Sequence, residues 1–326
     1  VVASGRRGML TTCGYDAGSH RVIPVEHCLI EDERADAIIA TVRKLAVSFK
    51  LRAYDEDRRT GFLRHILVRA GRREVMLVLV TATAEFPSKS RFVAALRDAH
   101  PELTTIVQNV NDRRTNMVLG TRDIPLYGSG RIEDELCGKV FRLSPQSFYQ
   151  VNSAQTEVLY GLAKEMAQLS GRETVVDAYC GVGTIGLSMI EQCGRLIGVE
   201  LNSQAVKDAA QNAKRNGVSN AAFYQGDAGT FLTQCASEGA AVDVVLMDPP
   251  RSGSDGAFLS ALLRLKPKRI VYISCDPTTL ARDLKTLCAG GYAMERAVPV
   301  DMFPLTMHVE NVVLLSKRDA DKHNHR

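Results

Sequence analysis

One cysteine stands where its thiol could act as a nucleophile. Cys275 follows the apolar run 270–274 and comes directly before Asp276 and Pro277, which open a predicted helix. The field at a helix N-terminus lowers the pKa of a thiol and so favours the reactive thiolate. Cys180, inside a glycine-rich turn, is the alternative, although cysteines in such turns are more often small packing residues. We therefore take Cys275 as the candidate nucleophile.

A glycine-rich turn in the second half of the sequence predicts a cofactor site. The stretch 175–186, VVDAYCGVGTIG, begins with apolar residues, reaches Asp177 and then places glycines at positions 181, 183 and 186. This order is typical of a buried parallel strand, a tight turn and a helix N-terminus that together hold a cofactor. A carboxylate beside the turn disfavours the pyrophosphate of a dinucleotide. Asp177 therefore favours a positively charged ligand such as S-adenosylmethionine over a nicotinamide dinucleotide.

Acidic residues follow three further apolar runs of the same region. Glu200 follows the run 196–199, Asp227 follows a third run, and Asp248 opens the motif DPPRSG after a fourth. Residues at the carboxyl ends of parallel strands line the crevice where open α/β sheets bind ligands. The two prolines stiffen the backbone after Asp248, so its carboxylate should face this crevice instead of a helix start. We expect Glu200 to bind the ribose hydroxyls of the cofactor.

The elements that must position these residues alternate between strand and helix from about residue 150. Asn152 and Gln155 have the spacing of a capping box and predict the start of a helix that ends at Leu169. Helices are also predicted over 203–216 and 277–289, and strands over 174–178, 196–199, 222–224, 242–246, 270–274 and 312–315. Such alternation predicts an α/β fold with a doubly wound, mostly parallel sheet of the Rossmann-like type.

The first part of the chain has a different pattern, which predicts a smaller α+β domain. Residues 35–49 carry apolar side chains on one helical face, and Ser88 is a candidate cap for a second helix that ends at His100. Extended segments are predicted over 21–25, 65–69, 75–81, 104–110, 117–119 and 140–143. We expect this domain over 1–138, a catalytic domain over 139–318 and a loose polar tail over 319–326.

The excess positive charge of the chain lies in its first part. Residues 1–150 contain 23 Lys and Arg against 18 Asp and Glu, whereas residues 151–326 contain 18 against 19. Arginine binds phosphate in a bidentate manner and stacks on bases, so the first domain is predicted to bind RNA. A solvated charged face is the alternative. The densest run of arginines comprises Arg58, Arg59, Arg64, Arg69, Arg72 and Arg73.

Composition limits the class of protein. The chain of 326 residues is 45% hydrophobic, yet it has no apolar run of about 18 residues and no secretory signal. We therefore expect no membrane association. Its eight cysteines include no Cys-x-x-Cys pair, which predicts a reducing, cytoplasmic compartment. Separately, we expect the protein to be a monomer.

Four motifs in the second half of the chain resemble those of a known family. VVDAYCGVGTIGLSM, MDPPRSG, YISCDPTTLARDL and DMFPLTMHVENVVLLSK occur in this order, and FRLSPQSFYQVNSAQTEVLY precedes them. Together they resemble the RNA uracil-5 methyltransferases, which form 5-methyluridine. The resemblance is strong over about 139–317 and looser before it. It implies a class I methyltransferase fold with S-adenosylmethionine as methyl donor.

The resemblance also implies roles for individual residues. Cys275 would be the nucleophile, and Glu310 would be the general base that begins the last strand. Thr184 stands where some members of the family have a polar contact to the cofactor. The residues implied to contact S-adenosylmethionine are Gln150, Tyr179, Glu200, Asp227 and Asp248.

The chemistry explains why these residue types are required. Carbon 5 of uracil is a poor nucleophile, and addition of a thiolate to carbon 6 converts the ring into an enolate that accepts a methyl group. The proton on carbon 5 must then leave before the thiolate is expelled, so a general base is required. We expect Asp248 to orient the donor or the base without transferring protons itself.

Many members of this family carry a TRAM-type barrel and an iron–sulfur cluster. Cys28 is similar to the fourth cysteine ligand of such clusters, but the three closely spaced cysteines expected before it are not found, and Cys13 alone cannot replace them. A cluster is therefore expected only if a further N-terminal segment supplies its other ligands. We predict no other metal site.

The predicted function is methylation of uridine at carbon 5, in 23S ribosomal RNA, with transfer RNA as the alternative substrate. A cytosine-5 RNA methyltransferase would carry a second cysteine in a Pro-Cys pair, whereas the DPPRSG motif has none. A non-catalytic RNA-binding factor on a methyltransferase scaffold and a nicotinamide oxidoreductase are the remaining alternatives. Cys275 argues against the first of these.

Overall fold

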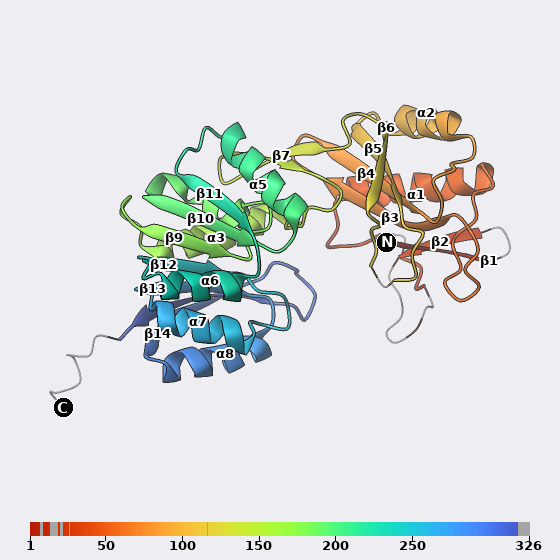
Figure 1. The fold of residues 1–326 in the computed structure, drawn as a ribbon. Coiled ribbons are helices and arrows are strands. Elements are labelled where there is room, and N and C mark those ends of the chain that lie inside the picture. The colour runs from red at the N-terminus through yellow and green to blue at the C-terminus, as the bar shows by residue number, and fades with distance from the viewer. Residues whose placement is uncertain (7–8, 14–18, 20–21, 26, 116, 319–326) are drawn as a thin grey trace. The chain divides into compact units, whose positions relative to one another are not determined.

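A computed structural model describes residues 1–6, 9–13, 19, 22–25, 27–115 and 117–318 (Figure 1). The chain forms two compact units: residues 1–134 with 142–146, and residues 135–141 with 147–326. The predicted domain boundary at 138–139 lies in the turn between strands β7 (Ile132–Leu136) and β8 (Lys139–Leu143), which pair with each other. The predicted polar tail lies outside the described residues. No helix of the described part is long and apolar enough to cross a membrane.

The larger unit contains a seven-stranded sheet, and the predicted α/β fold is confirmed. Five strands run parallel, β15 runs antiparallel to β13, and β14 runs antiparallel to β15. The spatial order is β11 (Ala221–Gln225), β10 (Arg195–Glu200), β9 (Thr174–Ala178), β12 (Val244–Met247), β13 (Arg269–Ser274), β15 (Glu310–Lys317) and β14 (Tyr292–Val300). The order reverses beside β9, which places the ligand crevice of such sheets at its carboxyl end.

Helices accompany this sheet and bury its apolar residues. Side chains of β9, β12 and β13 form one core with helices α6, α7 and α8, in which Val176, Val245, Leu262 and Tyr272 are fully buried. Burial of each such side chain stabilises the fold by about 1.5–3 kcal/mol. The helices are α3 (Ser153–Ala167), α4 (Thr184–Ser188), α5 (Ser203–Arg215), α6 (Ala228–Ser237), α7 (Gly256–Leu265) and α8 (Pro277–Ala289), with a 3₁₀ turn at Ile190–Gln192.

Polar side chains begin most of these helices. Asn202, Asp227, Asp255 and Asp276 each accept a backbone N–H at the start of α5, α6, α7 and α8. Asn152 does the same for α3, since its Oδ1 accepts the N–H of Gln155 at 3.2 Å. Each such cap is worth about 1 kcal/mol. Helix starts therefore follow the strand ends directly, at the edge where the acidic residues lie.

The smaller unit is an α+β structure with a six-stranded sheet. Helices α1 (Glu33–Ser48) and α2 (Lys89–Ala99) pack their apolar faces on it, with Ile38, Val42, Leu77 and Leu96 almost fully buried. The spatial order of the strands is β2 (Met9–Cys13), β1 (Val2–Arg6), β3 (Leu63–Ala70), β4 (Val75–Thr81), β5 (Leu103–Val110) and β6 (Arg122–Tyr127).

Several local predictions for the smaller unit were wrong. Ser88 precedes α2 in a left-handed conformation and makes no side-chain cap bond. Residues 117–119 lie outside any strand. β5 pairs with β4 on one side and, on the other, with the edge strand β6, which carries Pro125. A proline weakens a strand pattern and is tolerated at the edge of a sheet. Residues 22–25 contain an isolated bridge and no strand.

Two arginines of the predicted RNA-binding run have structural roles instead. The Arg64 side chain is 2% exposed, and it donates to Glu56 Oε1 at 2.9 Å and to the Asn111 carbonyl at 2.8 Å. Arg69 Nη2 donates to the Pro145 carbonyl at 3.0 Å, and desolvation lowers the pKa of Arg69 to about 10. The run is therefore not one continuous charged face. Its exposed members are Arg58, Arg59, Arg72 and Arg73.

Candidate active site

The candidate nucleophile lies between a buried strand and a helix, as the sequence predicts. Cys275 follows β13, and Asp276 caps α8 by accepting the N–H groups of Thr278 and Thr279 at 2.8 and 3.0 Å. The pKa of Cys275 is nevertheless raised, first by burial and then by the negative charges of Glu310 and Asp248. The prediction of a lowered thiol pKa was therefore wrong. The Asp276 carboxylate already occupies the helix N-terminus, and two further carboxyl groups lie close enough to act on the thiol electrostatically.

The register of β15 brings the candidate base to the candidate nucleophile. Asn311 pairs with Ser274 of β13, so Glu310 lies one residue further along, beside Cys275. Glu310 also pairs with Val300, the last residue of β14, and it is only 5% exposed. Burial raises the pKa of Glu310, while the charge of Arg251 opposes the shift. A carboxylate whose pKa is raised in this way is a stronger base than an exposed one.

Asp248 completes a group of two acids and one thiol. It follows β12 and is half-buried at the end of the strand next to β13. Burial raises the pKa of Asp248 to about 8, and the charges of Glu310 and Asp177 contribute to the shift. A carboxyl group with this pKa keeps its proton at neutral pH and can donate a hydrogen bond.

Arg251 is a residue of this site that the sequence reasoning missed. Its positive charge lowers the pKa of both Cys275 and Glu310, opposing the effect of burial on each. The side chain therefore lies close enough to both groups to act on them electrostatically. An arginine directly after the two prolines of DPPRSG was the available signal, but only the prolines and Asp248 were interpreted.

The glycine turn after β9 leaves one carboxylate oxygen without a partner. Asp177 Oδ2 accepts the N–H of Gly186 at 2.9 Å, whereas its Oδ1 is buried and bonds to no described residue. Burial raises the pKa of Asp177 to about 7. Gly183, at φ +86°, begins α4 in the left-handed region that favours glycine. The unpartnered oxygen suits a ligand that carries a positive charge or a hydrogen-bond donor.

Glu200 and Asp227 lie together at the ends of the neighbouring strands. Glu200 Oε2 accepts the N–H of Gly181 in the glycine turn at 3.1 Å. Its backbone carbonyl accepts the N–H of Gly226 at 3.0 Å, immediately before Asp227. Asp227 Oδ1 accepts the N–H and hydroxyl of Thr230 at 2.8 and 2.9 Å. The carboxyl edge of the sheet therefore carries carboxylates from three adjacent strands.

Tyr179 lies at the end of β9 in a left-handed conformation, at φ +67°. Its ring packs on Phe258 with centroids 5.2 Å apart, and its hydroxyl donates to Ser254 Oγ at 3.5 Å. Desolvation raises the pKa of Tyr179 to about 12, so the hydroxyl stays protonated. A side chain other than glycine is uncommon at such a backbone angle and is often found at functional sites.

The remaining two predicted residues lie at the edge of this group. Thr184 Oγ1 shares a hydrogen bond with the Tyr160 hydroxyl of α3 at 3.1 Å, so this contact directs it toward α3. Gln150 is half-buried in the segment before α3. Asn152, two residues later, donates to the Met302 carbonyl at 3.2 Å, in the loop that leads to Glu310. Gln150 is thus close in sequence to a residue anchored beside the site.

The described residues contain no group of three or more His, Cys, Asp or Glu side chains that could hold a metal ion. Cys28 is half-buried, and its backbone N–H donates to Asp36 Oδ2 at 3.0 Å. The side chain of Cys13 lies outside the described ones. The possible fourth cluster ligand therefore has no partner cysteines among the side chains that the structure describes.

Comparisons with known proteins identify the family of the chain. A family model described as tRNA (Uracil-5-)-methyltransferase matches residues 131–318. An uncharacterized RNA methyltransferase of Bacillus cereus is 45% identical over 96% of this chain and 68% of its own length. Another, from Enterococcus faecalis, is 46% identical over 94% and 68%.

Solved structures extend the similarity to the fold. The tRNA (uracil-54, C5)-methyltransferase of Pyrococcus abyssi, in complex with S-adenosyl-L-homocysteine, is 26% identical with a TM-score of 0.78. The match covers 97% of this chain and 74% of the archaeal one. The chain is therefore an RNA methyltransferase and belongs to the RNA uracil-5 methyltransferase family.

Proposed function

We propose that this protein methylates carbon 5 of uridine in RNA by covalent catalysis, with S-adenosylmethionine as methyl donor. The observation that carries the proposal is the register of β15, which sets the buried carboxyl of Glu310 beside Cys275. A nucleophile and a base at one point are the two groups that the chemistry of uracil carbon 5 requires. The family membership supports the choice of uracil.

The crevice fits the proposed donor. The buried oxygen of Asp177 without a partner suits the ammonium group of a methionine moiety. Glu200, at the end of β10, is the residue that we assign to the ribose hydroxyls. When bound, S-adenosylmethionine supplies an electrophilic methyl group next to a positively charged sulfur. Asp227, Tyr179, Gln150, Asp248 and Thr184 are the further contacts that we propose, and Thr184 would have to share its hydroxyl with Tyr160.

Cys275 acts first in the proposed reaction. Its thiolate sulfur forms a bond to carbon 6 of uracil, and the electrons of the C5–C6 double bond move to the carbonyl at carbon 4. Carbon 5 becomes nucleophilic and accepts the methyl group. Because the pKa of Cys275 is raised, Arg251 has a necessary role: its charge opposes the shift and favours the thiolate.

Glu310 completes the proposed reaction. Its carboxylate removes the proton from carbon 5, the C5–C6 double bond forms again, and the sulfur leaves as thiolate. The raised pKa of Glu310 makes it a stronger base than an exposed carboxylate. Asp248, neutral near pH 7, orients the uracil or the donor by donating a hydrogen bond. It transfers no proton in this scheme.

We propose 23S ribosomal RNA as the substrate, on the resemblance of the catalytic motifs. The similarity to the archaeal tRNA methyltransferase makes transfer RNA the second candidate. Exposed arginines of the smaller unit provide phosphate contacts in this proposal. In the larger unit Phe148, Leu305 and Met307 are exposed, and the last two lie in the loop before Glu310. Phe148 is the aromatic member of this group and can stack on an unpaired base.

The test is the product and its position. RNA from cells with and without the gene should differ by 5-methyluridine at one site, which mass spectrometry of RNase fragments locates. The purified protein should restore the modification to RNA from the deletion strain. Restoration by the Cys275→Ala variant, or methylation of cytosine, would refute the proposal.

A further inference from the structure

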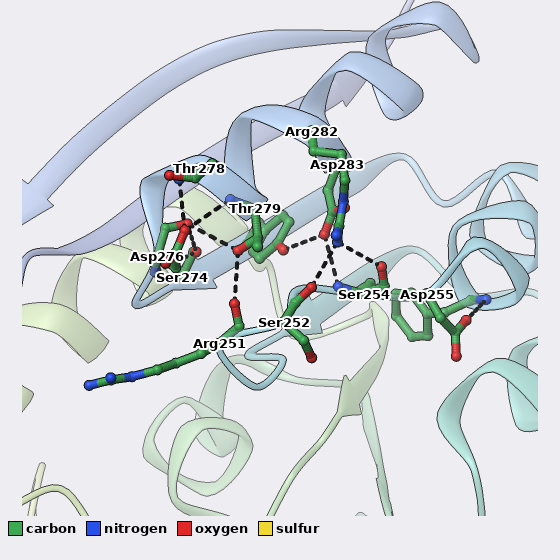
Figure 2. A network of polar contacts seen from close by, with 12 residues as sticks. Arg251, Ser252, Ser254, Asp255, Ser274, Asp276, Thr278, Thr279, Arg282 and Asp283 are labelled. Carbon is green, nitrogen blue, oxygen red and sulfur yellow. Dashed lines mark hydrogen bonds and ion pairs between the residues drawn. The ribbon is translucent and has the colours of Figure 1, made fainter. Parts of the chain in front are cut away.

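One polar network joins helix α8 to the loop that carries Arg251 (Figure 2). We name this network the α8 clamp, and it consists of Thr279, Arg282 and Asp283 of α8 with Tyr272 of β13. Its targets are the backbone groups of residues 251–254, which follow Asp248 and the two prolines. None of its four members has a part in the chemistry described above.

Asp283 is the centre of the clamp. Its side chain is fully buried, and Oδ2 accepts the N–H of Ser254 at 2.9 Å and the hydroxyl of Tyr272 at 2.7 Å. Its Oδ1 accepts Nε of Arg282 at 2.9 Å. A buried carboxylate is costly unless it is paired and hydrogen-bonded, and this one bonds to three donors. The loop thus supplies one of the bonds that make the buried charge tolerable.

Arg282 and Thr279 hold the carbonyl groups of the same loop. Arg282 Nη2 donates to the carbonyls of Ser252 and Ser254 at 2.9 and 3.1 Å. Thr279 Oγ1 donates to the carbonyl of Arg251 at 3.2 Å. Figure 2 shows the Arg251 carbonyl facing Thr279 while its side chain extends away from the network. The backbone of Arg251 is therefore fixed, and its guanidinium is left to act elsewhere.

The loop fits the clamp so closely that one residue must be glycine. Gly253 has φ +72°, and a Cβ there would lie 2.5 Å from Arg282 Nη2 and 2.8 Å from Asp283 Oδ2. Real Cβ atoms do not approach other atoms this closely. Ser254, next in the chain, is 4% exposed and receives the Tyr179 hydroxyl at 3.5 Å. The loop is thus held between α8 and the end of β9.

The clamp joins two parts of the site that come from different segments. Helix α8 begins two residues after Cys275, whereas Arg251 follows β12. We propose that Asp283 and Arg282 are positioning residues, which hold the loop so that the Arg251 guanidinium lies beside the Cys275 thiol. The inference rests on the proposed covalent mechanism. The charge of Arg251 then favours the thiolate only while the hydrogen bonds of the clamp hold the loop in place.

A double-mutant cycle tests this link. The variants are Asp283→Asn, Arg251→Gln and the double variant, and the measurement is single-turnover adduct formation with 5-fluorouridine RNA and S-adenosylmethionine, from pH 6 to pH 9. Asp283→Asn should slow the reaction by up to about 100-fold, as a misplaced group does. Its pH profile should move toward higher pH, as in Arg251→Gln. The double variant should be no slower than Arg251→Gln, because both substitutions remove the same effect, the action of the Arg251 charge on the thiol.

Two controls separate positioning from folding. Asp243→Asn removes a partly buried carboxylate at the other end of β12 and should leave the pH profile unchanged. Thr279→Val removes the hydroxyl that bonds to the carbonyls of Arg251 and Asp276, keeps Asp283 and Arg282, and should show a smaller loss with the same shift of the profile. If the rate losses of the two single variants add up in the double variant, the proposed role of the clamp is wrong. The same holds if Asp283→Asn keeps the pH profile of the wild-type protein. Neither result would contradict the covalent mechanism. Absence of any adduct in the wild-type protein would overturn the covalent mechanism itself.

Discussion

Replacement of Asp248 by asparagine should stabilise the protein at neutral and basic pH. Burial, with the charges of Glu310 and Asp177, raises the pKa of this carboxyl from 3.8 to about 8. Between these values the folded protein keeps a proton that the unfolded chain has released. The contribution to stability therefore falls as the pH rises from about 4 to about 8. Asparagine resembles the neutral acid in shape and has no proton to lose.

The size of the effect follows from the shift. About 4 pKa units at 1.36 kcal/mol each give an upper limit of roughly 5–6 kcal/mol. Asp248 is only half-buried, so solvent screening reduces this limit. We therefore expect Asp248→Asn to raise the free energy of unfolding by about 2–3 kcal/mol at pH 8 and by little at pH 5. For a unit of this size the melting temperature should rise by roughly 4–12 °C at pH 8.

Thermal unfolding of both proteins at pH 5, 6, 7 and 8 measures this difference. Asp243→Asn is the matched control, because Asp243 lies just before the same strand, at its other end. Burial would raise the pKa of Asp243, but hydrogen bonds from Lys268 and the Thr174 N–H outweigh it, and the pKa is lowered. Asp243→Asn should lower the free energy of unfolding by up to about 1 kcal/mol at pH 8. Equal stability of wild type and Asp248→Asn across this range would refute the reasoning.

Three further substitutions test the proposed mechanism and the RNA surface. Cys275→Ala should abolish methyl transfer and still bind S-adenosylmethionine in calorimetry, because the thiol reacts with the uracil ring and does not contact the methyl donor. Glu310→Gln should transfer the methyl group and stay joined to RNA, which gel electrophoresis under denaturing conditions detects; ordinary turnover would assign the base elsewhere. Reversal of the exposed arginines to glutamate should reduce the salt slope of RNA binding by about 0.7–0.9 for each phosphate that is no longer neutralised. The residues to be reversed are Arg58, Arg59, Arg72 and Arg73. An unchanged salt slope would mean that these arginines form a solvated face that does not bind RNA.

The sequence was sufficient for the α/β fold because strand and helix patterns alternate clearly after residue 150. Parallel strands bring their carboxyl ends to one edge, so Asp177, Glu200 and Asp248 could be placed near one another without coordinates. The position of Glu310 beside Cys275 needed more. It depends on the register of the antiparallel strand β15, which no local pattern specifies. Only the family resemblance pointed to Glu310 in advance.

The errors share one cause, since a sequence pattern does not show what surrounds a charged group. A helix start after Cys275 predicts a lowered thiol pKa, but the two nearby carboxyl groups come from distant segments. Arg64 and Arg69 belong to a dense run of arginines, yet their side chains turn to carbonyl groups of the same unit. Arg251 lies in a motif that was interpreted through its prolines. In each case the deciding partner is remote in sequence.

The acidic character of the site gives a physical reason for the proposed role of the α8 clamp. Asp177, Asp248 and Glu310 all have raised pKa values, so each disfavours the folded state as the pH rises. A positively charged donor relieves this repulsion when it binds, but the thiol must be activated by a charge that is always present. In the proposed mechanism Arg251 supplies that charge, and at the surface its side chain could point in many directions. Under this proposal, fixing the backbone of Arg251 through α8 places an activating cation where the carboxyl groups would otherwise suppress the thiolate.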